Sequence, residues 1–328
     1  MPSLHRPFLA ALAAAFISIT AAHGAGFTIE RSIALPDTTG RIDHLAIDLD
    51  GNLIFVAEHD NGTLDVVNLA TGKVSGRITD LAEPQGVAYI AGTGQVVVAN
   101  GGDGSVKFFD ATSLAPGPET ELGSDADNIR LAPDTQQVLV GYGDGGLAII
   151  DPAHGRVVKK ITLAAHPESF QLSSDGTSAY VNLPDSARIG VADLKTGTVD
   201  SISTPDLGGN FPMAAESKTG RLAVAFRSPA KLALVDPEGK AIVTAIDTCG
   251  DADDVFFDAK RSLLYITCGA GTVDIVRQAG DRLTSVAKVP TGNGARTGLF
   301  VPELDRLFVA APAHGDQGAR ILVLKPDA

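Results

Sequence analysis

A repeat with a period of about 42 residues runs through almost the whole chain, and it restricts the fold more than any other feature. Each unit contains an apolar segment, a polar turn and a second apolar segment. We take the last residue of the first segment as the anchor of the unit, and its partner in the second segment follows nine residues later. Successive anchors are separated by 42, 42, 41, 43, 42 and 43 residues. The anchors are Ile47, Tyr89, Leu131, Leu172, Ala215, Phe257 and Phe300, and their partners are Val56, Val98, Val140, Val181, Val224, Ile266 and Val309.

Units of this length, with about four short strands each, are typical of β-propeller blades. In the first unit we expect strands at 45–48, 53–58, 63–69 and 73–79. Asn61-Gly62 and Thr71-Gly72 supply turns between them, since glycine adopts positive φ without steric cost. The seven anchors therefore predict an all-β fold, a seven-bladed β-propeller of four-stranded antiparallel blades.

The seventh unit is one strand short. It contains apolar segments at 297–300, 307–310 and 321–324, whereas residues 27–35 form an isolated strand-like segment with no local partner. Pairing this segment with the last unit removes an exposed sheet edge and joins the two ends of the ring. We therefore expect the N-terminal strand to close the seventh blade, and residues 26–328 to form a single domain.

Residues 1–25 have the features of a secretory signal peptide. His5 and Arg6 form a weakly basic start, residues 8–22 are continuously apolar, and small residues around 22–25 offer a cleavage site. The apolar run is too short to span a bilayer, and no later stretch is long enough. We expect a periplasmic or secreted monomer without a membrane span after signal cleavage; an uncleaved membrane anchor is the alternative.

Composition and missing motifs exclude several functions. The net charge of −13 would on average repel a phosphate backbone, so nucleic acid is an unfavourable partner. The chain has no Cys-x-x-Cys-His motif for covalent haem, no Gly-rich phosphate loop for NAD, no Gly-x-Ser-x-Gly elbow and no His-Glu-x-x-His motif. Tryptophan is absent, which argues against a pyrroloquinoline quinone enzyme that stacks an indole on its cofactor.

Three segments carry a resemblance to a known family. The segments at 97–110 (VVANGGDGSVKFFD), 140–151 (VGYGDGGLAIID) and 266–276 (ITCGAGTVDIV) resemble the YVTN-repeat, YncE-like propellers. The resemblance covers essentially all of residues 26–328 and implies a seven-bladed scaffold. It implies little about activity, because this scaffold hosts different roles. The corresponding loops of units four, five and seven depart from the family's Asn-Gly-rich turn.

Topology sorts the polar residues by face. In such a blade, the connection into the innermost strand and the connection between the second and third strands lie on one face, which we call the site face. A first ring of positions lies four residues before the anchors and contains Asp43, Gln85, Asp127, Glu168, Phe211, Asp253 and Arg296. A second ring lies three residues before the anchors and contains His44, Gly86, Asn128, Ser169, Pro212, Asp254 and Thr297. These two rings are almost free of apolar residues, and we expect them to surround the mouth of the central channel.

Crowded carboxylates raise one another's pKa or recruit a cation. Arg41, Arg130 and Arg296 are placed to neutralise some of them through bidentate pairs. A hydrated mouth with internally paired charges is the alternative to a binding site. The predicted ligand-binding residues are Asp43, His44, Gln85, Asp127, Asn128, His166, Glu168, Phe211, Arg227, Asp253, Asp254 and Arg296.

Two kinds of divalent-cation site are compatible with these residues. An oxygen-only calcium site would use Asp127, Asn128, Glu168, Asp253 and Asp254. Imidazole and carboxylate ligands suit zinc or copper, and such a site would combine His44, His59 and His314 with Asp43, Glu58 and Asp60. The sequence does not decide between a cation and the absence of any cofactor.

The two cysteines, Cys249 and Cys268, are expected at the site-face ends of the sixth unit. In an oxidising compartment they would form a disulfide that closes a loop of about twenty residues. Two buried thiols or soft metal ligands are the alternatives.

Two functional hypotheses follow from these patterns. The first is a non-catalytic binding or scaffold protein for a small polar or cationic ligand, a metal ion or a protein partner. The second is a metal-dependent hydrolase or lyase, resembling propeller lactonases or streptogramin lyases. In the second hypothesis His44, His166 and Glu168 would be the catalytic residues, with a histidine as acid or base and carboxylates holding the metal.

Overall fold

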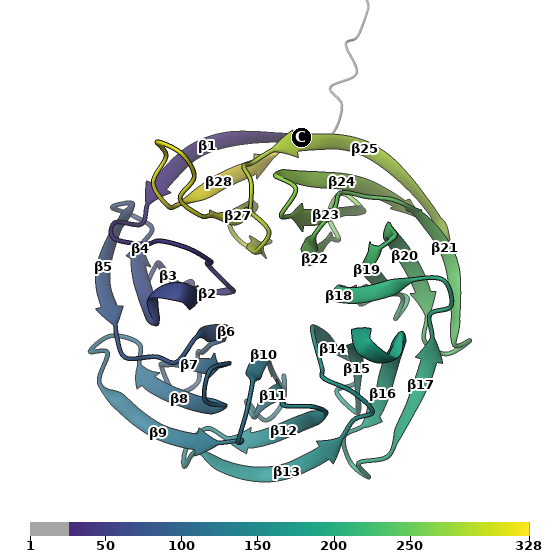
Figure 1. Cartoon of the computed structure of the whole chain (residues 1–328), viewed down its shortest axis with the longest axis horizontal. Coiled ribbons are helices and arrows are strands. Elements are labelled where there is room, and N and C mark those ends of the chain that lie inside the picture. Colours follow the sequence, from purple (N-terminus) through teal and green to yellow (C-terminus); the bar gives the residue numbers. More distant parts are fainter. Residues whose placement is uncertain (1–25, 328) are drawn as a thin grey trace, which may run out of the picture.

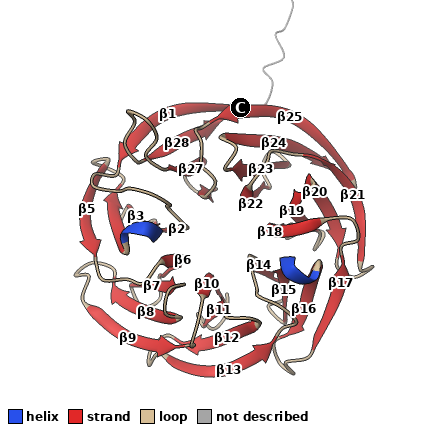
Figure 2. Cartoon of the chain, in the orientation of Figure 1, coloured by secondary structure: helices blue, strands red, loops and turns tan. Residues whose placement is uncertain are grey.

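The computed structural model describes residues 26–327, which form seven four-stranded antiparallel sheets arranged in a ring (Figure 1). The predicted seven-bladed β-propeller is thus confirmed. The predicted signal peptide, residues 1–25, lies outside the described residues. Two single-turn 3-10 helices interrupt the β structure, η1 (His59–Asn61) and η2 (Pro184–Ser186), and Figure 2 shows both on loops near the inner part of the ring.

In the first four blades the chain runs from the innermost strand to the outermost. Blade one contains β2 (Leu45–Asp48), β3 (Leu53–Glu58), β4 (Thr63–Asn68) and β5 (Lys73–Ile78). Blade two contains β6 (Pro84–Ile90), β7 (Gln95–Asn100), β8 (Ser105–Asp110) and β9 (Pro116–Glu121). Blade three contains β10 (Ala126–Leu131), β11 (Val138–Tyr142), β12 (Gly146–Asp151) and β13 (Arg156–Thr162). Blade four contains β14 (Phe170–Leu172), β15 (Ser178–Leu183), β16 (Arg188–Asp193) and β17 (Val199–Ser203).

The remaining three blades follow the same order. Blade five contains β18 (Gly208–Ala215), β19 (Leu222–Ser228), β20 (Ala230–Asp236) and β21 (Ala241–Asp247). Blade six contains β22 (Ala252–Asp258), β23 (Leu263–Cys268), β24 (Thr272–Ala279) and β25 (Arg282–Pro290). Blade seven contains β26 (Gly298–Val301), β27 (Arg306–Ala311), β28 (Arg320–Pro326) and, on its outer edge, β1 (Phe27–Ala34).

Position within a blade explains the residue pattern of each strand. The second strands are almost wholly apolar and buried, as in β7 (QVVVAN), because the neighbouring blades cover both of their faces. The outermost strands alternate, as in β13 (RVVKKIT), because only one face meets the core. Seven hydrophobic clusters result, one at each junction between neighbouring blades. The packing of blade on blade therefore positions the innermost strands.

The ring closes through β1, which pairs antiparallel with β28 from Phe27 opposite Pro326 to Ala34 opposite Arg320. This closure confirms the predicted role of the N-terminal strand. Ile33 of β1 is 1% exposed and belongs to the core cluster shared by blades one and seven. The pairing thus joins both ends of the described chain to one sheet (Figure 1).

Two further observations concern the sixth blade and the chain as a whole. Cys249, which precedes β22, forms a disulfide with Cys268 at the end of β23, and their Cα atoms are 5.9 Å apart. Both residues belong to the apolar cluster between blades five and six. None of the helices among the described residues has the length and apolar character needed to cross a bilayer.

Substitution Ile33→Ala tests the closure. It should lower the free energy of unfolding by about 2–5 kcal/mol, because it leaves a cavity in a closed core. Ile29→Ala on the same strand is the matched control, since Ile29 is 45% exposed, and it should change stability by no more than about 0.5 kcal/mol. Chemical denaturation measures both. Equal effects of the two substitutions would contradict a structural role for the inward face of β1.

Candidate functional site

Four of the innermost strands depart from regular pairing at the predicted ring positions. The register shifts lie between Pro84 and Val87 in β6, Ala126 and Ile129 in β10, Asn210 and Met213 in β18, and Ala252 and Asp254 in β22. A β-bulge releases a residue from the ladder and turns its side chain in a new direction. The bulges explain why these strands present polar residues to the channel mouth without exposing an apolar face there.

The two acidic motifs at 125–128 and 251–254 share the same local structure. Asp125 and Asp251 both have positive φ, 39° and 56°. Their carbonyl oxygens accept hydrogen bonds from the N–H groups of Gly143 at 3.0 Å and Gly269 at 2.8 Å. The side chain of Asp125 also accepts a bond of 3.1 Å from Gln85. The motifs are equivalent turns that lead into the innermost strands of blades three and six.

Arginines neutralise the carboxylates of blade six. Asp253 accepts a short hydrogen bond from Arg227, and its other oxygen lies 3.3 Å from Nε of Arg296. Asp251 lies 3.4 Å from Arg227 and 3.3 Å from Arg296. The guanidinium of Arg227 stacks on the ring of Phe211, 3.6 Å from its centroid. Phe211, which the sequence predicted as a ligand-binding residue, is thus covered by an arginine.

A second charge cluster surrounds Asp43 at the start of blade one. Asp43 is fully buried, with Arg41 at 2.5 Å and Nδ1 of His44 at 2.6 Å. Burial alone would raise the pKa of Asp43, but the contact with His44 and the charges of His44 and Arg41 lower it to about 2. Burial would lower the pKa of His44, yet Asp43 and more distant carboxylates raise it to about 10. A pKa raised this far disfavours the role of base at neutral pH, one of the two predicted roles of His44 as acid or base.

The mouth also brings together Asp127, His166 and Glu168, whose ligand atoms all lie within 4.8 Å of one another. Among residues 26–327 this is the only such group of three or more histidine, cysteine or acidic side chains. Nδ1 of His166 lies 2.7 Å from the carbonyl oxygen of Gly143. A carbonyl oxygen only accepts, so Nδ1 carries the proton. The lone pair of His166 is then on Nε2, 3.9 Å from Oε1 of Glu168.

Asp127 and Glu168 lack the neutralising partners of the other mouth carboxylates. In the described part of the chain, no lysine or arginine nitrogen lies within 4.0 Å of either carboxylate. Burial and the charges of Asp127 and Asp253 raise the pKa of Glu168 to about 9. Burial is also the main cause that raises the pKa of Asp127 to about 6. The mouth carboxyl groups that hold a proton most readily therefore lie on blades three and four.

The structure does not bring together all the residues of either predicted metal site. Of the calcium set, Asp127 and Glu168 lie in the cluster with His166, whereas Asp253 is paired with arginines and Asp254 accepts a 2.8 Å bond from the N–H of Gly298. The zinc or copper set does not assemble. His59 contacts Asp60 at 2.7 Å, and Glu58 is buried with hydrogen bonds from Thr38 and Thr63. His59, Asp60 and Glu58 therefore form contacts within the loops of blade one. Their positions in the sequence did not predict these contacts.

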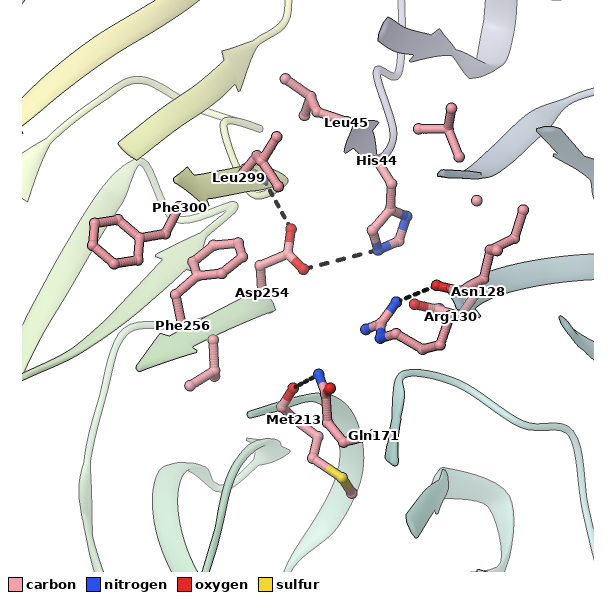
Figure 3. A pocket seen from close by; sticks show the side chains of 15 residues that line it. His44, Leu45, Asn128, Arg130, Gln171, Met213, Asp254, Phe256, Leu299 and Phe300 are labelled. Carbon is pink, nitrogen blue, oxygen red and sulfur yellow. Dashed lines mark hydrogen bonds and ion pairs between the residues drawn. The ribbon is translucent and has the colours of Figure 1, made fainter. Parts of the chain in front are cut away.

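A cavity of about 230 Å³ lies between all seven innermost strands (Figure 3). His44, Asn128 and Asp254 line it, as the sequence predicted. Burial and the charge of Asp253 raise the pKa of Asp254, and the charge of His44 partly offsets this increase. The resulting pKa of Asp254 is about 7. Sequence reasoning did not identify most of the remaining lining residues, which lie one to three positions further along the strands: Leu45, Val87, Gln171, Met213, Leu299 and Phe300.

Arg130 also lines this cavity, and one expectation about it was wrong. In the described residues no carboxylate oxygen lies within 4.0 Å of its guanidinium, so it forms no bidentate ion pair. Nη1 donates to the carbonyl of Ile129 at 2.7 Å, and Nη2 donates to Ser169 at 3.2 Å. By contrast, Arg41 and Arg296 pair with carboxylates as the sequence suggested.

Comparisons with known proteins support the fold. No protein-family model matches the chain, and no curated protein matches it. A hydrazine synthase structure from Kuenenia stuttgartiensis superposes with a TM-score of 0.73 at 18% identity, over 86% of this chain and 96% of that chain. A chain of a mitotic checkpoint complex superposes with a TM-score of 0.78 at 14% identity, over 98% of each chain. At these identities the similarity shows the β-propeller fold alone.

Gly86 provides a test of the site's construction. A Cβ atom at this position would overlap the main-chain carbonyl oxygen of Asp127, so Gly86→Ala must displace the backbone of β6 or β10. We expect a loss of about 1–3 kcal/mol in the free energy of unfolding. Gly318→Ala is the control, because a Cβ there meets no atom within 4 Å. Denaturation curves that are identical for the two variants would contradict this close approach.

Proposed function

We propose that this chain is a non-catalytic binding propeller of the YVTN-repeat, YncE-like type, and that its channel mouth binds a divalent transition-metal cation such as zinc. One observation carries the proposal. Asp127 and Glu168 are adjacent carboxylates with no lysine or arginine partner among residues 26–327, in a mouth where arginines pair with Asp43, Asp251 and Asp253. Leaving two such groups together is unfavourable unless one binds a proton or both bind a cation.

The donor set favours a transition metal over calcium. His166 contributes a nitrogen, and zinc binds mixtures of imidazole and carboxylate ligands, whereas calcium prefers oxygen alone. Metal-binding histidines usually donate their second ring N–H to a carbonyl or carboxylate, which fixes the tautomer and the ring orientation. The bond from Nδ1 of His166 to Gly143 has that form and leaves Nε2 toward the two carboxylates.

Export is the second part of the proposal. The basic start, the apolar run at 8–22 and the small residues at 22–25 support secretion through a cleaved signal peptide. The disulfide between Cys249 and Cys268 supports an oxidising compartment. We therefore infer that the propeller acts in the periplasm or outside the cell.

Zinc binding should release protons and strengthen as the pH rises. The pKa of Glu168 is raised to about 9, so below this pH its carboxyl group holds a proton that the metal must displace. From pH 6 to 9 the affinity should therefore increase, by about tenfold per pH unit for each proton displaced. The charged groups that act on the pKa of Glu168 are Asp127, Asp253, Arg227 and His44, and the ring of His166 lies 3.9 Å from its carboxyl group.

Isothermal titration calorimetry with Zn²⁺, in buffers of different ionisation enthalpy, measures both the affinity and the proton release. His166→Ala and Glu168→Gln should each weaken binding at least about tenfold. His154→Ala is the matched control, because His154 is exposed on the opposite face, and it should bind as the parent protein does. Absence of zinc binding, or equal binding by all the variants, would contradict the proposed site.

A reporter fusion tests export. Residues 1–30 fused to an enzyme that is active only after translocation should give reporter activity in a bacterial host. Leu12→Arg places a charge within the apolar run and should abolish that activity. Activity confined to the cytoplasmic fraction would reject secretion and would leave the cation site untouched.

A further inference from the structure

The cavity between the innermost strands contains charged and polar groups that the proposed cation site does not use. Figure 3 shows the side chains of His44, Arg130 and Asp254 directed toward one central space, with Asn128 beside them. These four residues come from blades one, three and six. The cavity volume of about 230 Å³ corresponds to roughly eight water molecules, which is enough for a small organic ligand.

Arg130 provides the positive group. Its five N–H groups have two protein acceptors, the carbonyl of Ile129 and the hydroxyl of Ser169. Among residues 26–327 no carboxylate lies within 4.0 Å of it, so donors remain for a ligand. A guanidinium offers two parallel N–H groups that match the two oxygens of a carboxylate. His44 adds a second donor: its Nδ1 faces Asp43, whose charge favours the protonated ring, and the Nε2–H of that ring faces the cavity.

Asn128 and Asp254 provide acceptors on other parts of the wall. Asn128 is 2% exposed, and its Oδ1 has no hydrogen-bond partner among the described residues. Such a buried orphan acceptor costs free energy until a donor reaches it. Oδ1 of Asp254 lies 3.8 Å from Nε2 of His44, which is too long for a hydrogen bond. Both oxygens are thus placed to accept from N–H groups of a ligand.

Apart from Gln171, whose Nε2 donates to the carbonyl oxygen of Met213, the other side chains of the wall are apolar. Leu45, Val87, Met213, Leu299 and Phe300 line the cavity between the polar groups. Such a wall suits a short aliphatic body and excludes a ligand that is polar over its whole surface. The cavity is thus apolar between its charged and polar groups, and a ligand must satisfy both kinds of surface.

We infer that the channel cavity binds a small zwitterion of the amino-acid type. Its carboxylate would lie on Arg130 and His44, its ammonium group would donate to Asn128 and Asp254, and its aliphatic part would contact the apolar wall. Ligands with only one of the two charges would leave either the guanidinium or the buried acceptors unpaired. This inference goes beyond the proposed cation site and depends on different residues.

Calorimetric titration of the metal-free protein, in the presence of a chelator, tests the inference. The probes are the unbranched amino acids from glycine to 6-aminohexanoate, which vary the separation of the two charges, with the matching carboxylic acids and amines as singly charged controls. At least one zwitterion should bind, and its singly charged analogues should bind at least tenfold more weakly. No binding across the series, or equal binding of an acid and its amino acid, would overturn the inference.

Variants identify the binding groups. Arg130→Gln should weaken zwitterion binding at least tenfold, whereas Arg156→Gln, on the exposed outermost strand of the same blade, should not change it. Met213→Phe reduces the cavity without altering any charge and should also weaken binding, which keeps the test decisive if Arg130→Gln does not fold. Undiminished binding in the folded cavity variants would overturn the assignment.

The two sites fail independently. His166→Ala should lose zinc and still bind the zwitterion, because His166 does not line the cavity. Zinc binding without zwitterion binding would reject the cavity inference alone. Zwitterion binding without zinc binding would reject the cation site alone.

Discussion

The apolar packing between neighbouring blades determines everything that happens at the channel mouth. Each junction has its own hydrophobic cluster, and the pairing of β1 with β28 completes the seventh. Because the ring is closed, the seven innermost strands are held at fixed positions around one axis, and none of them needs an apolar face toward that axis. The scaffold therefore tolerates a concentration of ionised groups at its centre that an ordinary core would exclude.

That tolerance is unequal around the ring. Blades five to seven combine Asp251 and Asp253 with two arginines, and blade one combines Asp43 with Arg41 and His44. In blades three and four, no such partner lies beside Asp127 or Glu168 in the described part of the chain. Desolvation penalises every unpaired carboxylate, so the two partnerless groups hold protons more tightly than isolated side chains do. The mouth thus has one side whose carboxylates are paired with arginines and one side whose carboxyl groups have raised pKa values.

The sequence predicted the fold well because each blade repeats the same pattern of strands and turns. Strands expected at 45–48 and 53–58 are found there, and those expected at 63–69 and 73–79 end only one residue earlier. The positions of Asp127, Asp253 and His44 at the mouth followed from the same period. The period did not predict which arginine would pair with which carboxylate, because this pairing depends on bulges and side-chain directions that do not repeat from blade to blade. Arg130 was expected to pair with a carboxylate and instead donates to Ile129 and Ser169. The apolar residues of the cavity wall were not predicted, because they belong to strand segments whose pattern is that of an ordinary core.

The bulges in β6, β10, β18 and β22 have a consequence for how such a protein changes over time. Their residues are released from the ladder and point away from the inter-blade clusters, so a replacement there alters the mouth with little effect on the packing that maintains the ring. Gly86 is an exception, because its small size is required by the backbone of Asp127. Selection for a new ligand can therefore act on a few structurally equivalent positions one at a time, while the scaffold that carries them stays folded.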